Sequence, residues 1–225
     1  NVTDPSRMLI AGGSFLYQMT GANGPSPALF SYNLPNVSSI AFGTAKNANA
    51  AYLGYGTFVL KYSGNIFVGT AGLPAGANAV TDVAMDPENE SVAFAIDNDQ
   101  VFRSTDAGNA WVDITGNLPA ISAQDFRTIE FISDPAGDSV ALGTRSGVYT
   151  APVTASVWAP FGNGLPDVLV YDLRYVASTR TLYAGTLGRG VWSTSNGAAA
   201  AAGQIDIVGP PGSVDFGRTV TVLPN

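Results

Sequence analysis

The stretch that decides the fold is Ser104–Trp111, which reads STDAGNAW and has the form S-x-D-x-G-x-x-W. This form is typical of a tight turn between two β-strands. Asp106 can accept hydrogen bonds from backbone N–H groups two or three residues further on, and Gly108 can take a positive φ. Ser104 can tie the end of the first strand to the turn, and Trp111 opens the next strand with a large face to bury. The weight of this pattern depends on whether the surrounding chain repeats.

A repeat of about 45 residues is present, a length typical of one supersecondary unit. Leu-Pro pairs begin at positions 34, 73, 118 and 165, so they are 39, 45 and 47 residues apart. After each pair comes an apolar pattern h-x-x-h-x-h, which begins at positions 37, 80, 126 and 170 and therefore recurs after 43, 46 and 44 residues. The pattern predicts the first strand of each unit.

Three further strands follow the first one in each unit. They are short runs of β-branched and aromatic residues, bounded by Gly, Pro, Asn and Asp. A turn such as Asp86-Pro87 or Asp134-Pro135 separates the first strand from the second, and Asp4-Pro5 is expected to be the same turn. The second strands are expected at 8–11, 51–55, 92–96, 140–143 and 182–185, the third at 15–18, 58–61, 101–103, 148–149 and 191–192, and the fourth from Leu29, Ile66, Trp111 and Trp158. Four antiparallel strands in 40 to 50 residues are the signature of a β-propeller blade.

Ser104–Trp111 resembles the Asp box of the sialidase-type BNR repeat, and Thr181–Ser193 resembles the strand, hairpin and strand that precede such a box. The resemblance covers about residues 4 to 197. Propellers of this superfamily include sialidases, family 74 xyloglucan hydrolases, sortilin-type receptors and a photosystem II assembly factor. One box is intact, because Thr150–Trp158 has lost the Asp and Gly, and Ser193–Gly197 has lost the Asp. The resemblance implies a propeller and no particular chemistry, since the Asp box is a structural turn in all these families.

Composition excludes several functions. The chain has no Cys and no His, which rules out disulfides, a thiolate nucleophile, the usual Cys/His zinc sites and a Ser-His-Asp triad. A net charge of -7 and a pI near 4.3 argue against nucleic acid as a partner. No apolar run approaches the length of a membrane span. Few Lys and many Asn, Gly, Ser and Thr favour an extracytoplasmic protein.

The all-β domain is expected to be a partial propeller over residues 1–197 that is entered in mid-blade. The count is three strands, three complete blades and three more strands, or about four and a half blades. Residues 198–203 are an Ala/Gly linker. Residues 204–225 are either closing strands or the start of an immunoglobulin-like domain, because Val214-Asp215-Phe216-Gly217 resembles the start of such domains. We therefore expect either a longer polypeptide or a partner that completes the ring.

The candidate ligand-binding residues lie in two sets of loops that share one face of a propeller, opposite the Asp box. These loops are the hairpins between second and third strands and the loops that enter the first strands. Asp97 and Asp99 offer hard oxygen ligands to Ca²⁺, but Asp-Asn-Asp is also favoured by hairpin turns, and we expect the turn and no metal. The candidates are Asp97, Asp99, Arg145 and Arg189 from the hairpins and Asp125 and Asp167 from the entry loops.

Two enzymatic interpretations remain open. A sialidase needs an arginine triad, and Arg127, Arg145, Arg174 and Arg189 lie in successive units, although no Arg-Ile-Pro motif or Tyr/Glu pair accompanies them. A family 74 hydrolase needs two carboxylates across a groove, for which Asp82 with Asp172, or Asp125 with Asp167, are candidates. Arginines that pair locally, and carboxylates that recur only because the unit repeats, are the favoured explanations. The aromatic residues Trp111, Trp158, Trp192, Tyr149, Tyr175 and Tyr183 are expected in the core between blades rather than as sugar platforms.

The sequence thus predicts a non-catalytic recognition or scaffold propeller that binds a protein or glycan through its loop face, with no cofactor. The alternatives are a glycoside hydrolase and an accessory subunit of a larger membrane-associated complex. An enzyme predicts clustered carboxylates with a perturbed pKa in one cleft, whereas a scaffold predicts a flat face with scattered charges.

Overall fold

The computed structural model describes residues 1, 4–21, 28–63, 65–121, 123–162, 164–194 and 206–207. They form five antiparallel sheets, which we call the first to the fifth sheet. The first sheet contains β1 (Met8–Gly12), β2 (Phe15–Thr20) and β3 (Ala28–Tyr32). The second contains β4 (Val37–Phe42), β5 (Ala51–Tyr55), β6 (Phe58–Ser63) and β7 (Ile66–Gly69). The third contains β8 (Asp82–Met85), β9 (Ala93–Ile96), β10 (Val101–Ser104) and β11 (Val112–Asp113).

The last two sheets repeat the same order. The fourth sheet contains β12 (Thr128–Ile132), β13 (Ser139–Thr144), β14 (Gly147–Pro152) and β15 (Ala159–Pro160). The fifth contains β16 (Val170–Val176), β17 (Thr181–Thr186), β18 (Gly190–Thr194) and β19 (Asp206–Ile207). A 3₁₀ turn at Leu118–Ile121, in one of the Leu-Pro segments, is the only helical element among the described residues. No helix in this part of the chain has the length and apolar character needed to cross a membrane.

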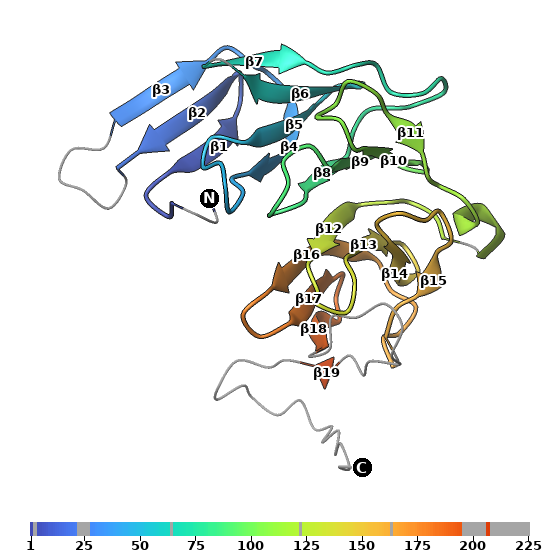
Figure 1. Cartoon of the computed structure of the whole chain (residues 1–225). Helices are drawn as coiled ribbons and strands as arrows, with labels where there is room; N and C mark the ends of the chain where they lie inside the picture. Colours follow the sequence, from blue (N-terminus) through green and yellow to red (C-terminus); the bar gives the residue numbers. More distant parts are fainter. Residues whose placement is uncertain are drawn as a thin grey trace.

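The sheets follow one another around a common centre, as blades do in a β-propeller. Figure 1 shows β4, β8, β12 and β16 along the inner side of this arrangement, and each of these strands contacts the next. Strand order within each sheet runs outward in chain order, so the structure confirms the predicted antiparallel meanders. The fourth strands start within one residue of their predicted positions, at Ala28, Ile66, Val112 and Ala159, and β11 and β15 are only two residues long.

Apolar side chains pack between neighbouring sheets, since each strand alternates its side chains between two faces. Phe94 of the third sheet lies against Phe131 of the fourth, with ring centroids 6.2 Å apart. Trp158 is buried beside them, and its Nε1 donates to the Ile114 carbonyl at 2.9 Å. Leu173 and Leu182 of the fifth sheet pack on the other face of the fourth sheet. The predicted core positions of the aromatic residues are confirmed for Trp111, Trp158, Tyr149 and Tyr175, while Trp192 and Tyr183 are half-buried.

The predicted Asp-Pro turn is present at Asp4, Asp86 and Asp134. The Asp4 carboxylate accepts from the Ser6 N–H at 3.0 Å, Asp86 accepts from Glu88 at 2.8 Å and Asp134 accepts from Ala136 at 2.9 Å. Asp134 also accepts three hydrogen bonds from the Arg180 guanidinium of the fifth sheet, at 2.5, 2.7 and 2.9 Å. The Asp134 carboxylate thus stabilises its own turn and also binds the fourth sheet to the fifth.

The turn from Ser104 to Trp111 has the conformation that its residues favour. Gly108 has the predicted positive φ, at 77°. The Ser104 hydroxyl donates to Asp106 at 2.9 Å and accepts from the Gly108 N–H at 2.8 Å. The Asp106 carboxylate accepts from the Ala110 N–H at 2.9 Å, which is four residues on rather than two or three, because the Ala107-Gly108 pair at positive φ folds the chain back. The turn packs on the second sheet through the Trp111 Nε1, which donates to Thr70 at 3.1 Å.

The fifth sheet has one strand more than the sequence-based count, whereas the first sheet agrees with it. The fifth sheet has a fourth strand, because Asp206 pairs with Ser193 and Ile207 with Trp192. These two residues belong to the segment 204–225, for which closing strands and an immunoglobulin-like domain were the alternatives. The linker 198–203 and residues 208–225 lie outside the described residues. The first sheet has three strands, as expected, and β1 occupies the place that second strands occupy in the other sheets.

Candidate functional site

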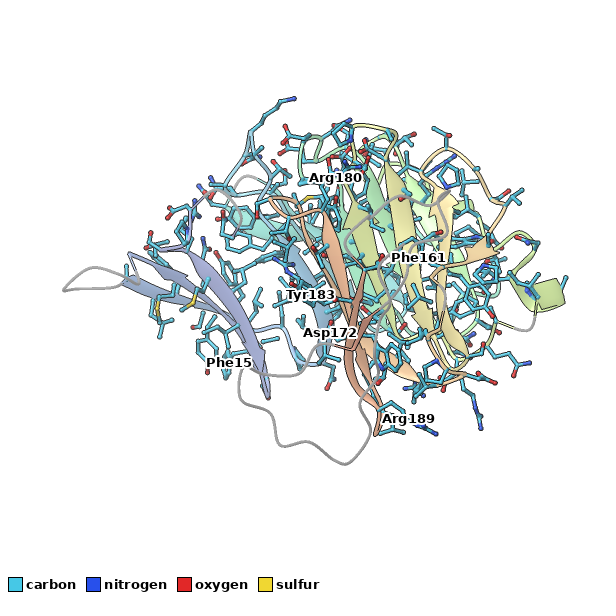
Figure 2. All side chains as sticks on the ribbon, turned by 90° about the horizontal axis from the view of Figure 1, so that it is seen from below. Phe15, Phe161, Asp172, Arg180, Tyr183 and Arg189 are labelled. Carbon is cyan, nitrogen blue, oxygen red and sulfur yellow. The ribbon has the colours of Figure 1, made fainter. Side chains whose placement is uncertain are left out.

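The predicted ligand-binding loops meet at one end of the sheets. Backbone hydrogen bonds join each hairpin to a neighbouring entry loop: Phe126 N–H donates to Asn98, and Arg145 N–H to Gln124, both at 2.9 Å. Leu187 N–H donates to Leu169 at 2.9 Å in the fifth sheet. Figure 2 shows Arg189, in a hairpin of this set, and Arg180, in a turn after a first strand, at opposite ends of the fifth sheet. The loop face is therefore distinct from the face of the Asp turns.

Two adjoining hollows on this face form what we call the loop-face groove. Their volumes are about 690 and 590 Å³, and they share Gln124, Asp125 and Arg145. The first is also lined by Asn98, Asp99, Gln100, Asp113, Thr115, Pro119 and Ala123, and the second by Ser146, Asp167, Val168, Leu169 and Leu187. The groove thus brings together four of the six predicted residues, Asp99, Asp125, Arg145 and Asp167.

The charged side chains of the groove are of two kinds. The Asp125 carboxylate binds the Arg127 guanidinium at 2.6 Å, and this ion pair raises the pKa of Arg127. Asp125 also has a positive φ of 54°, an uncommon conformation outside glycine. By contrast, the exposed side chains of Arg145 and Asp167 have no hydrogen-bond or ion-pair partner within the part of the chain that the structure describes. A ligand can therefore bind them without breaking contacts of the fold.

Asp97 lies beneath the groove instead of lining it. Its carboxylate is fully buried and accepts three backbone N–H groups, from Asn78 at 2.7 Å, Asp99 at 2.9 Å and Gln100 at 2.7 Å. The pKa of the neighbouring Asp99 is raised, first by burial and then by Asp97. Asp97 thus holds the hairpin in shape, as the turn interpretation of Asp-Asn-Asp expects. Among the described residues no cluster of three or more carboxylates has the geometry to hold a metal ion.

Arg189 is exposed at the tip of the hairpin between β17 and β18. Its carbonyl accepts from the Trp192 Nε1 at 3.0 Å. It does not line either hollow of the groove, although Leu187 of the same hairpin does. Of the four arginines considered for a triad, Arg145 lines the groove and Arg174 lines a different cavity.

The cavity that Arg174 lines is at the centre of the sheets and has a volume of about 540 Å³. Its walls are formed by residues of β4, β8, β12 and β16 and by residues that follow these strands. It contains Glu130, whose side chain is 19% exposed and whose Oε1 lies 3.8 Å from the Arg174 Nη1. Burial raises the pKa of Glu130 to about 7 and that of Asp82 to about 6, and Asp172 contributes to both shifts. Asp82 and Asp172 were candidates from the sequence, whereas Glu130 was not. The only signal was a charged residue between two apolar positions of a predicted first strand.

The central carboxylates are bound to backbone. Asp82 accepts from the Ile129 N–H at 2.9 Å and from its neighbour Val83 at 2.9 Å, and Glu130 accepts from the Tyr175 N–H at 2.8 Å. These hydrogen bonds join β8 to β12 and β12 to β16. The clustered carboxylates that an enzyme predicts are thus present, but each of these two has a structural partner.

Comparison with known proteins identifies the fold. No family model matches the chain, and no curated protein matches it either. Among solved structures, the β-propeller domain of Cps50 (Swd1) from Myceliophteria thermophila is similar, with a TM-score of 0.59, 14% identity and coverage of 88% of this chain and 73% of that chain. The chain is a β-propeller.

Two further neighbours have the same fold. An ancestral GH74 enzyme aligns with a TM-score of 0.62 and 16% identity, over 88% of this chain and 29% of that chain. YCF48 bound to D1 peptide aligns with a TM-score of 0.58 and 14% identity, over 86% of this chain and 63% of that chain. The propeller therefore spans less than a third of the GH74 enzyme.

Proposed function

We propose that this propeller is a non-catalytic recognition module that binds a protein or glycan in the loop-face groove. The observation that carries the proposal is the contrast between the two sets of charged residues. Arg145 and Asp167 in the groove have no partner among the described residues, whereas Asp82 and Glu130 on the inner strands accept backbone hydrogen bonds. Polar groups that are not needed by the fold are available for a ligand. Rigid sheets that carry such groups on loops are a common arrangement for binding.

The lining of the groove indicates which ligands suit it. Carboxylates, amides and hydroxyls dominate, and no aromatic ring is among the lining residues of either hollow. A ligand is therefore held by hydrogen bonds and charge rather than by ring stacking. Polar glycans and extended polar peptide segments both satisfy this chemistry.

We also infer that the chain belongs to the Asp-box type of propeller. The hydrogen bonds of Ser104 and Asp106 and the positive φ of Gly108 support this assignment. Composition supports a location outside the cytoplasm. A role as accessory subunit of a membrane-associated complex is compatible with the same groove, and the neighbour YCF48, whose structure contains a D1 peptide, provides a precedent for peptide binding on this fold.

The binding proposal is tested by probing the protein on a glycan array and with a displayed library of random peptides. For any ligand found, the double variant Arg145→Ala/Asp167→Asn should weaken binding at least tenfold, which corresponds to about 1.4 kcal/mol. Arg189→Ala is the matched control, since Arg189 is an exposed arginine outside the two hollows. Ligands whose affinity is the same for the double variant and for the wild type would contradict the proposal.

A glycoside hydrolase is the second candidate, because the pKa values of Glu130, which lines the central cavity, and of Asp82 on the neighbouring inner strand are both raised. A carboxyl group that stays protonated near neutral pH is suited to general acid catalysis. The test is release of reducing sugar from xyloglucan oligosaccharides and of sialic acid from sialyllactose. Activity that Glu130→Gln abolishes while the protein stays folded would replace the recognition proposal, and absence of hydrolysis would leave the groove as the functional site.

A further inference from the structure

The floor of the loop-face groove joins loops of neighbouring sheets. The entry loop before β12 bonds to a hairpin on each side: its Gln124 carbonyl accepts from the Arg145 N–H of the fourth sheet at 2.9 Å. Its Phe126 N–H donates to the Asn98 carbonyl of the third sheet, also at 2.9 Å. The third, fourth and fifth sheets, whose loops line the groove, each have four strands. The backbone of these sheets therefore fixes the position of the lining side chains.

The lining of the groove has more negative than positive charge. Of its four carboxylates, Asp125 is neutralised by an ion pair with an arginine. Asp99, Asp113 and Asp167 form no ion pair within the described part of the chain. The hydrogen bonds that Asp99 and Asp113 accept come from neutral amide groups, at 2.8 to 3.4 Å. Against these three carboxylates stands the guanidinium of Arg145, so the groove attracts positive charge.

Each hollow of the groove combines an unpaired carboxylate with an aliphatic wall. The second hollow is lined by Asp167 together with Val168, Leu169 and Leu187, and the Leu187 side chain is 57% exposed. The first hollow has Pro119 in its lining with two of the carboxylates. Lys and Arg side chains have the matching form, because an apolar stem ends in a positively charged group. The stem can cover Leu187 while the charged group binds Asp167.

Glycans match this lining less well than basic peptides do. No aromatic ring lines either hollow, so a sugar ring has nothing to stack on. A neutral glycan leaves the three unpaired carboxylates without a counter-charge, and an acidic glycan brings like charges together, which is unfavourable. A basic peptide supplies both the opposite charge and the apolar stems.

We propose that the ligand of the loop-face groove is a polypeptide segment that contains at least two Lys or Arg residues, one for each hollow. This inference rests on the recognition function proposed above and specifies its ligand class. One basic side chain lies in the second hollow, with its stem on Leu187 and its charged group on the Asp167 carboxylate. Another lies in the first hollow and binds Asp99 or Asp113. Arg145, which both hollows share, donates to a backbone carbonyl of the segment between the two basic residues.

The first experiment selects binders to the wild-type protein from a displayed library of random peptides. We expect the enriched peptides to contain more Lys and Arg than Asp and Glu. The tightest of them is then synthesised, together with analogues in which norleucine replaces one Lys or citrulline replaces one Arg, so that the side chain keeps its length and loses its charge. Titration calorimetry compares these peptides on the wild type and on Asp167→Asn in a double-mutant cycle.

Asp167→Asn should weaken binding of the parent peptide about tenfold, and so should one of the neutral analogues on the wild type. That analogue should bind Asp167→Asn no more weakly than the parent peptide does, because the two changes remove the same contact. Glu88→Gln is the matched control, since it removes the same charge from an exposed carboxylate that lines neither hollow. Its affinity for the parent peptide should stay within about twofold of the wild type, as a charge distant from the ligand is screened by salt.

The possible failures separate this inference from the recognition proposal. Enriched peptides without Lys or Arg, or a glycan ligand, whose binding Arg145→Ala/Asp167→Asn weakens, would overturn the basic-peptide inference and leave the groove as the recognition site. Equal weakening by Glu88→Gln and Asp167→Asn would also overturn it, since the net charge of the whole chain and not the groove would then attract the peptide. Ligands that no groove variant affects, or no ligand from the library and the glycan array, would contradict both.

Discussion

Aspartate carboxylates that accept backbone N–H groups stabilise this molecule in three different surroundings. Asp106 does so in an exposed turn, Asp97 does so in a fully buried hairpin and Asp82 does so between two sheets. A lost acceptor costs more free energy where water cannot replace it. The free energy that such a hydrogen bond contributes to stability should therefore differ among Asp106, Asp97 and Asp82.

Asp106→Ala should lower Tm by roughly 2–6 °C, as loss of a side-chain cap does in a protein of this size. The hydrogen bonds from Ala110 and Ser104 lower the pKa of Asp106. A group with a lowered pKa stabilises the folded state above its ordinary pKa and loses this effect as the pH falls through the lowered value. The difference in Tm between wild type and variant should therefore be full at pH 7 and narrow in strong acid, as measured by calorimetry.

Asp167→Ala is the control for that experiment, since the Asp167 carboxylate has no hydrogen-bond or ion-pair partner in the described part of the chain and its removal should leave Tm unchanged within about 1 °C. The double variant Ser104→Ala/Asp106→Ala should lose less Tm than the sum of the losses in the two single variants, because the two side chains form one hydrogen-bonded network. Additive losses of Tm would contradict the hydrogen-bonded turn described above.

Asp97→Ala should be more damaging, with a loss of roughly 2–4 kcal/mol in the free energy of unfolding, because three backbone N–H groups lose a buried acceptor. Urea unfolding measures this loss. Because the carboxylate is already occupied by these donors, added Ca²⁺ should leave the urea midpoint of the wild type unchanged. A calcium-dependent increase of that midpoint would instead support the metal interpretation of Asp97 and Asp99.

At the scale of the elements, the strands were predictable because their signals are local. Alternating apolar residues between Asp-Pro turns and Leu-Pro pairs gave the order and type of the strands correctly. The hydrogen bonds between β8, β12 and β16 were not predictable, because Glu130 receives its partner from Tyr175, a residue of another sheet. The loop-face groove was partly predictable. The order of the strands assigns Asp125 and Arg145 to one face, but only the structure shows that Asp97 is buried below the groove.

Glu130→Gln tests the contact between β12 and β16. Burial raises the pKa of Glu130 from 4.5 to about 7, so between these values the folded state keeps a proton that the unfolded chain has released. The free energy of unfolding therefore falls as the pH rises through this window, by a total on the order of 3 kcal/mol, and the loss is complete above pH 7. Glutamine stays neutral and still offers an oxygen to the Tyr175 N–H, so the variant should be more stable than the wild type at pH 8 and equal to it near pH 4.5.

Urea unfolding at pH 4.5, 6 and 8 measures this difference, and Glu88→Gln is the control because Glu88 is exposed. A Glu130→Gln protein that is less stable than the wild type at pH 8 would show that the charge itself stabilises the folded state through Arg174, which lies 3.8 Å away. The raised pKa would then have to be assigned to another group in the cavity.

At the scale of the whole molecule, stability should be uneven around the ring. The third and fourth sheets are packed on both faces, and β9, β13 and most of β14 are buried along their length. The first sheet is packed on one face only, has an open edge at β1 and exposes Met8, Ile10 and Leu29. Regions with few buried apolar contacts open at lower free energy than the core of the same molecule.

Native-state amide exchange should therefore be fastest in β1, β2 and β3 and slowest in β9 and β13, with a rate difference of at least about a hundredfold, or roughly 2.7 kcal/mol in opening free energy. Hydrogen-exchange mass spectrometry at increasing urea measures the order of opening. The second sheet is an internal control, because it has four strands and lies between the first and third sheets. The amides of β5 should therefore exchange as slowly as those of β9 as long as the first sheet stays folded. Uniform protection over all five sheets would contradict this order and would mean that the apolar face of the first sheet is covered in solution.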